Sequence, residues 1–209
     1  MSSNGEQSLH QKILLTCREM LVEEGYKHLS MRKIARNVGV SPTSIYLHFE
    51  SKDHLMHTLM DQAINDLNSK LDRSINEVTD PLDKLRRLAG AYINYAIENP
   101  QKYQIIFFVK SDRMSRYPRD KFRRARRGYE MVEKAIRETI DAGRMLEAEP
   151  RVAAYVFWAQ LHGVTSAVLS GRLDHRLNRE QFFNKAIEQI MRGFSEAGSG
   201  DTEHSVNSN

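Results

Sequence analysis

The sequence predicts an all-helical (all-α) protein of about nine helices, with a small three-helix domain followed by a larger helical domain. Only 5 prolines and 11 glycines occur in 209 residues. Residues that favour helices, such as leucine, alanine, glutamate, lysine and arginine, are plentiful. Apolar residues recur every three or four positions, and no segment shows the two-residue alternation of a half-buried strand.

The prolines mark helix starts, because proline suits the first helical turn and disrupts a helix interior. Ser41, Asp80 and Asn99 precede three of them, and each offers a side-chain oxygen that can cap a helix. The prolines are Pro42, Pro81, Pro100, Pro118 and Pro150. Together with the apolar spacing they predict helices over 9–21, 31–38, 42–48, 52–75, 82–96, 101–109, 122–140, 150–170 and 179–194.

Composition and terminal sequence indicate a cytoplasmic protein. The single cysteine, Cys17, cannot form an intramolecular disulfide, and it lies in an apolar stripe that favours packing over a redox role. The start of the chain is polar and unlike a secretion signal. The longest unbroken apolar run, residues 153–159, is far shorter than the roughly 20 residues of a membrane span, so no membrane partner is expected.

Residues 30–52 have the pattern of a capped helix, a tight turn and a second capped helix. Ser30 and Ser41 can cap the two helices, and Gly39 supplies the backbone freedom that the turn needs. Ile45 and Phe49 are the inward residues of the second helix. Two short helices need a third to cover them, and the first long helix is the obvious support. A unit of this kind presents its last short helix to the major groove of DNA.

Four fragments stand in a fixed order between residues 24 and 55. They are Glu24-Gly25-Tyr26, Ser30-Met31-Arg32-Lys33-Ile34-Ala35, Val38-Gly39-Val40-Ser41 and Ile45-Tyr46-Leu47-His48-Phe49-Glu50-Ser51-Lys52-Asp53-His54-Leu55. With these fragments, residues 9–60 closely resemble the DNA-binding domain of TetR-type transcriptional regulators. Trp158-Ala159-Gln160-Leu161-His162-Gly163 also resembles the Trp…His-Gly segment of one class of C-terminal regulatory domain in that family.

The resemblance implies a ligand-responsive repressor that binds a partly palindromic operator in double-stranded DNA as a homodimer. A small-molecule effector, apolar or amphipathic, would bind the C-terminal domain and change the separation of the two DNA-reading heads. The positions expected at DNA are Ser30, Arg32, Lys33, Ser41, Thr43, Ser44, Tyr46, His48 and Lys52. Lys33, Thr43, Ser44 and His48 are expected at base edges, and Ser30, Ser41, Tyr46 and Lys52 at phosphates.

Three segments are expected along the chain. Residues 1–50 would bind DNA, residues 51–195 would bind the effector and dimerise, with a connecting helix from about 52, and residues 196–209 would be a disordered tail. An aromatic-rich set is expected to line the effector cavity: Tyr92, Tyr103, Phe107, Phe108, Tyr129, Trp158 and His162. Each of these could instead be ordinary core, and for His162 a hydrogen-bonded core or interface histidine is the favoured alternative.

The last two long helices are expected to dimerise as a four-helix bundle with those of a second copy. Small residues permit close approach of the helices, and aromatic and branched residues supply apolar contact. The residues expected at the interface are Ala159, Gly163, Ala167, Phe183, Ile187, Ile190 and Phe194.

Two charged features have open interpretations. Residues 110–127 carry nine cations against two anions. This suits a site for phosphate or another anion, such as an acyl-CoA-type ligand, or an auxiliary DNA contact, or a solvated face, which is the favoured alternative. His54, His57 and Asp61 have a spacing that could hold a metal, but a wet helix surface is the default, so no metal site is expected. No catalytic or cofactor motif occurs, so neither an enzyme nor a cofactor is expected.

A second class of function remains open at this point. The chain could be a small-molecule-binding or scaffolding helical protein whose DNA-binding domain is vestigial, and residues 30–52 could be an ordinary surface hairpin. The matching order of the fragments favours the DNA-binding interpretation. Binding to DNA that is sequence-specific and weakens as salt rises would separate the two classes.

Overall fold

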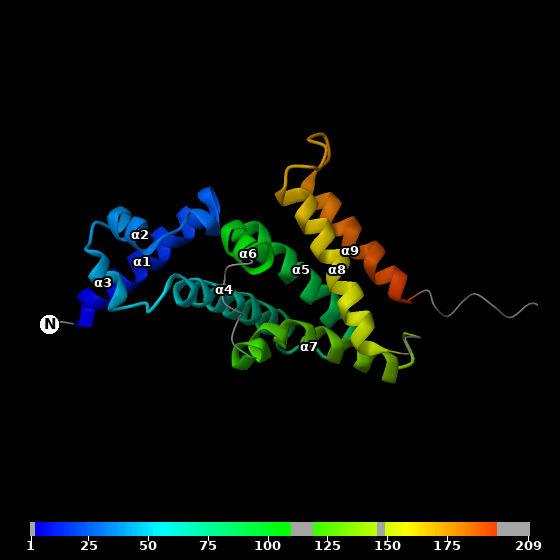
Figure 1. Cartoon of the computed structure of the whole chain (residues 1–209). Coiled ribbons are helices and arrows are strands. Elements are labelled where there is room, and N and C mark those ends of the chain that lie inside the picture. The colour runs from blue at the N-terminus through cyan, green and yellow to red at the C-terminus, as the bar shows by residue number, and fades with distance from the viewer. Residues whose placement is uncertain (1–2, 110–118, 146–148, 196–209) are drawn as a thin grey trace, which may run out of the picture. The chain divides into compact units, whose positions relative to one another are not determined.

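The structure is a computed structural model that describes residues 3–109, 119–145 and 149–195 (Figure 1). Across these residues it contains nine α-helices and one short 3-10 turn, with no strand, so the all-helical prediction is confirmed. The expected tail at 196–209 and Pro118 lie outside the described residues. The elements are α1 (Ser3–Glu24), η1 (Tyr26–His28), α2 (Met31–Val38), α3 (Pro42–Tyr46), α4 (Lys52–Ile75), α5 (Pro81–Glu98), α6 (Pro100–Phe107), α7 (Arg119–Asp141), α8 (Pro150–Leu169) and α9 (Arg179–Ser195).

The helix starts agree closely with the marks in the sequence. Ser41 Oγ accepts the Ser44 N–H at 3.2 Å, and Asp80 Oδ1 accepts the Asp83 N–H at 2.9 Å. The cap predicted at Asn99 is wrong: its ψ is 57°, far from the extended conformation that aims a cap at the first turn, and its side chain makes no cap hydrogen bond. The prolines that begin helices are Pro42, Pro81, Pro100 and Pro150.

The chain folds as two compact units. Unit 1 comprises Met1–Asn68 and Glu98–Ala125, and unit 2 comprises Ser69–Ile97 and Arg126–Asn209. The chain therefore passes between the units three times, and α4 and α7 belong partly to each. These units are defined by contacts within the chain. The boundary expected near residue 50 separates a DNA-binding part from an effector-binding and dimerising part, and it stays a prediction.

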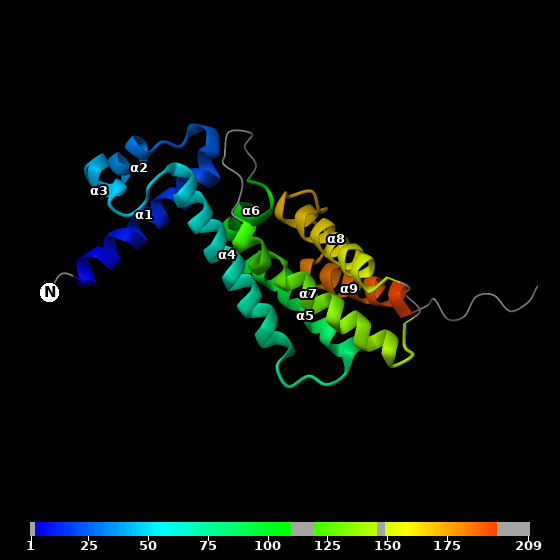
Figure 2. The ribbon, with the colours of Figure 1, turned by 60° about the horizontal axis from the view of Figure 1, so that its bottom comes forward.

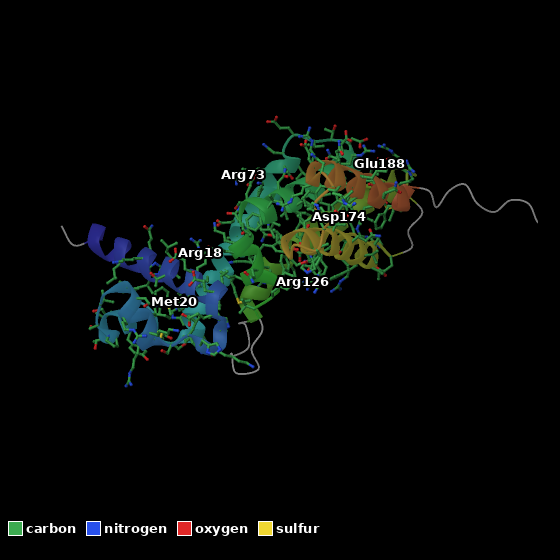
Figure 3. All side chains as sticks on the ribbon, turned by 90° about the horizontal axis from the view of Figure 1, so that it is seen from above. Arg18, Met20, Arg73, Arg126, Asp174 and Glu188 are labelled. Atoms are coloured by element: carbon green, nitrogen blue, oxygen red, sulfur yellow. The ribbon has the colours of Figure 1, made fainter. Side chains whose placement is uncertain are left out.

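Unit 1 has one apolar core, to which α1, α2, α3, the start of α4 and α6 contribute (Figure 1). Phe49 and Ile105 are each only 1% exposed in this core. Met20, labelled on α1 in Figure 3, is buried, and Asn37 Nδ2 of α2 donates a hydrogen bond to its sulfur at 3.0 Å. Cys17 is fully buried, and burial raises the pKa of its thiol to about 12, which suits packing and not reactivity.

Unit 2 is built from α5, most of α7, α8 and α9. The antiparallel pair α8 and α9 lies side by side in Figures 1 and 2. Leu85, Ile136 and Phe157 are among its fully buried side chains. Thr139 and Thr165 are also fully buried, and each hydroxyl donates to the carbonyl four residues earlier, so neither polar group is left unsatisfied.

Candidate DNA interface and aromatic cluster

A tight turn joins α2 to α3 as the sequence predicts. Ser30 caps α2 by accepting the Lys33 N–H at 3.2 Å. Gly39 ends α2 in the left-handed conformation, with φ 82° and ψ 34°, which a residue with a Cβ adopts only with strain. The Gly39 and Val40 N–H groups both donate to Ala35 O, at 2.9 and 3.0 Å. These bonds fix the direction in which α3 leaves the turn.

Helix α3 is shorter than predicted, since it ends at Tyr46 and not at residue 48. The His48 N–H bonds back to Ile45 O at 3.0 Å, a tighter connection than the α-helical one, and the Phe49 N–H bonds to the same oxygen. This tightening buries Phe49 beside Ile45, which is 0% exposed. The two side chains anchor α3 to the core of unit 1.

The outward side of α3 carries a group that we call the reading surface: Pro42, Thr43, Tyr46 and Leu47. All four are exposed, and Leu47 is 81% exposed, more than any other large apolar residue the structure describes. Leu47 is not among the residues predicted at DNA. Its position next to Tyr46, outside the inward pair Ile45 and Phe49, was the signal that could have identified it.

Several of the other expected DNA contacts already have partners within unit 1. Lys33 forms an ion pair with Glu24, and Ser44 shares a hydrogen bond with the Ser41 hydroxyl at 2.9 Å. Arg32, in contrast, has an exposed side chain. Ser30 is also exposed, but its hydroxyl already accepts the Lys33 N–H.

Lys52, expected at a phosphate, lies half-buried against the turn after α1. Its Nζ donates to Tyr26 O at 3.2 Å and to Leu29 O at 3.3 Å, and it stands 3.9 Å from the centre of the Tyr26 ring. The Tyr26 hydroxyl donates to Asp53, the neighbour of Lys52. The ammonium group is therefore engaged within the chain.

Three histidines gather around Phe49 behind α3. His10 of α1 stacks on the Phe49 ring with centroids 4.8 Å apart, and His48 meets the His10 ring edge-on at 6.0 Å. The ring of His54 meets the Phe49 ring edge-on at 5.9 Å. Burial lowers the pKa of His10, and the neighbouring charges of His48 and His54 lower it further.

The structure divides the predicted cavity residues between the two units. In unit 1, Tyr103 is 1% exposed and packs against Phe107, with ring centres 4.8 Å apart, and against Phe108. Phe108 also lines a cleft of about 210 Å³ between the ends of α1 and α6, together with Leu21, Val22, Gly25, Tyr26, Gln104, Ile105 and Val109. Tyr103 therefore serves the packing of α6, and Phe108 faces the cleft.

The other predicted residues form an aromatic cluster in unit 2, made of Tyr92, Tyr129, Tyr155, Trp158 and His162. Trp158 stacks on His162 at 5.0 Å and contacts Tyr129 at 5.3 Å, and Tyr129 stacks on Tyr155 at 4.7 Å. The Tyr92 hydroxyl shares a hydrogen bond with His162 Nδ1 at 3.1 Å. Sequence analysis named every member except Tyr155, which lies one helical turn before Trp158.

Burial sets the protonation of this aromatic cluster. It lowers the pKa of His162, so the imidazole is neutral near pH 7. Burial, followed by the neighbouring Tyr155, raises the pKa of Tyr129 to about 12. The cluster is thus a row of aromatic rings, each with a polar atom, in which the Tyr92 hydroxyl and His162 share a hydrogen bond.

The residues predicted at a dimer interface differ in exposure. Ala159 and Gly163 are exposed on α8, whereas Ile190 and Phe194 are each only 7% exposed. Phe194 packs edge-on against Phe157 of the same chain at 5.9 Å. Ile190 and Phe194 therefore belong to the core between α8 and α9. The half-buried members of the set are Ala167, Phe183 and Ile187.

Helix α8 leaves an apolar face uncovered. Val152, Tyr155 and Val156 are 58%, 42% and 45% exposed, and Ala159 and Gly163 continue the same face. A Cβ on Gly163 would meet no atom within 4 Å, so packing within the chain does not require glycine there. By length and composition alone α8 could span a membrane, and 33% of its apolar window is buried. The unbroken-run criterion overlooked this because polar residues interrupt the helix.

Residues 110–118 of the basic segment 110–127 lie outside the described residues. Of its cations with described side chains, Arg123, Arg124 and Arg126 are exposed on α7, where Figure 3 labels Arg126. Arg127 forms an ion pair with Asp72 of α4. In the part of the chain that the structure describes, no group of three His, Cys, Asp or Glu side chains could hold a metal ion.

A short capped helix displayed on a three-helix core defines a helix-turn-helix DNA-binding protein. Residues 13–59 match the family described as "Bacterial regulatory proteins, tetR family". Residues 85–190, about half of the chain, match "Tetracyclin repressor-like, C-terminal domain". The chain belongs to the TetR family of DNA-binding transcriptional regulators, whose members are non-enzymatic.

Relatives extend over most of the chain. Nucleoid occlusion factor SlmA of Vibrio cholerae is 25% identical over 181 residues, 86% of this chain and 87% of that protein. The transcriptional activator FasR of Mycolicibacterium smegmatis is 29% identical over 96 residues, 46% of this chain and 44% of that protein. The structure of AibR in complex with isovaleryl coenzyme A and operator DNA has a TM-score of 0.70 at 18% identity and covers 88% of this chain and 98% of AibR.

Acidification is expected to destabilise unit 1 through His10. The folded chain keeps His10 neutral at pH values where the unfolded chain, with an ordinary pKa near 6.5, takes up a proton. The free energy of unfolding therefore falls as the pH drops through that range. Below the lowered pKa of folded His10, both the folded and the unfolded chain carry the proton, so His10 causes no further fall in that free energy. Replacement of His10 by Phe keeps the stack on Phe49 and should flatten the dependence of melting temperature on pH between 7.5 and 5.5.

The matched control for this prediction is His28→Gln, since His28 is exposed. It should leave the pH dependence of the wild type unchanged. A residual slope is expected in every variant because burial also lowers the pKa of His162. Identical pH profiles for His10→Phe and the wild type would contradict the assignment.

Proposed function

We propose that the chain is a ligand-responsive repressor that binds a partly palindromic operator as a homodimer in the cytoplasm. The observation that carries the proposal is the reading surface. Exposed Tyr46 and Leu47 stand beside the buried anchors Ile45 and Phe49, so the side chains are presented outward on a fixed support. An exposed apolar residue beside short polar ones suits a major groove, where thymine offers a methyl group.

The proposed roles at DNA depend on whether each side chain is exposed and whether it already has partners within unit 1. Thr43 and Leu47 would meet base edges, and Tyr46 with Arg32 would contact the backbone. Ser30 and Ser41 would join them as hydroxyl donors, since their oxygens already accept the N–H groups of Lys33 and Ser44. Lys33, Ser44 and His48 have contacts within unit 1, so any base contact that they make is secondary. Sequence discrimination would therefore come mainly from two short or apolar side chains.

The uncovered face of α8 supports a homodimer. Its apolar residues continue along one side of the helix, and Gly163 offers open space where a second helix could approach closely. Packing against the same face of a second copy would bury it in a four-helix arrangement with α9. A soluble dimer accounts for the apolar length of α8 without a membrane.

The connecting helix α4 has 24 residues and so extends about 36 Å. Half-sites in successive major grooves of an operator lie about 34–36 Å apart, so the two heads of a dimer must hold that separation. An effector that binds better to a dimer with a different separation would release the operator.

The aromatic cluster of unit 2 is the proposed effector site. Its neutral His162, hydrogen-bonded to Tyr92, offers a polar group beside the Trp158 ring. AibR, a structural neighbour, is solved with isovaleryl coenzyme A. A short-chain acyl coenzyme A thioester is accordingly the first probe, and a free fatty acid is the second.

The reading surface is tested by selecting bound DNA from a random pool and measuring affinity against salt. The wild type should select a partly palindromic sequence and bind it more weakly as salt rises. Thr43→Ala and Leu47→Ala should each relax preference at particular bases, so that a mismatch there costs less than the usual value of about 1–3 kcal/mol. Tyr46→Ala should weaken all sequences alike.

Gln62→Ala, an exposed change on α4, serves as the control and should leave the selected sequence and affinity unchanged. Wild-type protein that selects no sequence at low salt would refute the regulator and favour a vestigial head. Equal losses from Thr43→Ala, Leu47→Ala and Tyr46→Ala on every sequence would refute the division of roles.

The dimer is tested with Val156→Glu and Gly163→Leu. Glutamate would place a charge in the apolar contact, and leucine would block close approach without disturbing the chain itself. Both variants should be folded monomers by light scattering after gel filtration, with much weaker operator binding. Asn94→Glu, exposed on α5, should remain a dimer. Unchanged dimers of both α8 variants would disprove this interface.

The effector site is tested by fluorescence, because Trp158 is the single tryptophan of the chain. Titration with isovaleryl coenzyme A or oleate should change the Trp158 emission and release operator DNA in the same concentration range. His162→Leu should weaken binding of the active probe about tenfold through loss of one hydrogen bond. Release of DNA with no change in emission would place the effector elsewhere.

A further inference from the structure

We propose that Lys52 is a positioning residue that latches the start of α4 to the turn after α1, and that it does not bind a DNA phosphate. The proposal rests on the proposed function, because it assigns a role within a DNA-binding head. All the contacts that carry it lie within unit 1.

Two neighbouring residues of α4 hold the same tyrosine. Lys52 Nζ lies 3.9 Å from the centre of the Tyr26 ring, and the Tyr26 hydroxyl donates to the carboxylate of Asp53. Tyr26 itself is buried, with 6% exposed. A cation over a tyrosine face is attracted by the negative face of the ring, more strongly where water is excluded.

The ammonium group of Lys52 is already occupied by partners within the chain. It has three N–H donors, of which two point to Tyr26 O at 3.2 Å and Leu29 O at 3.3 Å, while the ring occupies a further side. The two carbonyls belong to the first residue of η1 and to its C-cap, and Tyr26 O also accepts the Leu29 N–H at 3.2 Å. To reach a phosphate, Lys52 would have to give up two charge-assisted hydrogen bonds and the ring.

The position of the latch in the chain gives it a specific effect. Tyr26 and Lys52 flank the segment that contains α2 and α3. The contact between them therefore holds the two ends of that segment together. The core side chains fix α3 from inside, and the latch fixes both ends of the helix-turn-helix segment to the first turn of α4. Any movement of this turn would therefore carry the reading surface with it.

A charge-removing variant separates the latch from a phosphate contact. Lys52→Met keeps the apolar stem and removes the ammonium. If Lys52 is a latch, operator affinity falls while the slope of log affinity against log salt stays that of the wild type. A phosphate ligand would instead lower that slope by about 0.9 per subunit. Arg32→Met, at an exposed cation, is the matched control and should lower the slope.

A spectroscopic readout tests the same contact without relying on DNA binding. In protein labelled at lysine, the side-chain methylene protons of Lys52, assigned by their loss in Lys52→Arg, should be shifted upfield by the Tyr26 ring. The shift should persist in Tyr26→Phe, which keeps the ring and loses only the bond to Asp53. It should also persist when the selected operator is added to saturation.

Three results would overturn the latch: an unshifted Lys52 in the free protein, loss of the shift on operator binding, or a lower salt slope in Lys52→Met. A wild type that binds no operator would refute the proposed function. The shift of the Lys52 methylene protons in the free protein would still test the latch. Lys52→Met should also lower the melting temperature by about 3 °C in the absence of DNA. An unchanged melting temperature would count against the latch.

Discussion

The burial of Ile45 and Phe49 is the constraint on which the DNA-reading part depends. A helix of five residues has no stability of its own in water, because too few hydrogen bonds offset the cost of ordering it. Helix α3 exists because these two side chains are almost fully covered by the core of unit 1. The same anchoring turns Tyr46 and Leu47 outward, so the stability of the core and the exposure of the reading surface have one cause.

Local chemistry predicted most of the fold. Proline positions, serine and aspartate caps and the left-handed Gly39 act within a few residues, and they located the helices and the turn closely. What local chemistry could not indicate involves partners distant in sequence or fine geometry. The contacts of Lys52 with carbonyls 23 and 26 residues away are not visible in the spacing of the sequence, and the cap wrongly predicted at Asn99 depended on a backbone angle that sequence does not specify.

The candidate sites show the same limit. Helical spacing correctly paired Trp158 with His162, but it could not indicate that Tyr103 belongs to unit 1 and Tyr129 to unit 2. Similarly, apolar spacing on α9 does not distinguish a side chain that faces its own chain from one that faces a partner. Ile190 and Phe194 are covered by their own chain, whereas the face of α8 around Val156 remains uncovered.

Ile105 has a consequence for how the parts of this protein can be rearranged. It lies on α6, beyond α4 and α5, yet it is part of the same core as Ile34 and Phe49. A polypeptide that stopped at the end of α4 would keep every residue proposed to touch DNA and lose part of the cover over that core. Transplanting the reading part onto a different regulatory body therefore calls for α6 to travel with it, or for a substitute of matching shape in the recipient.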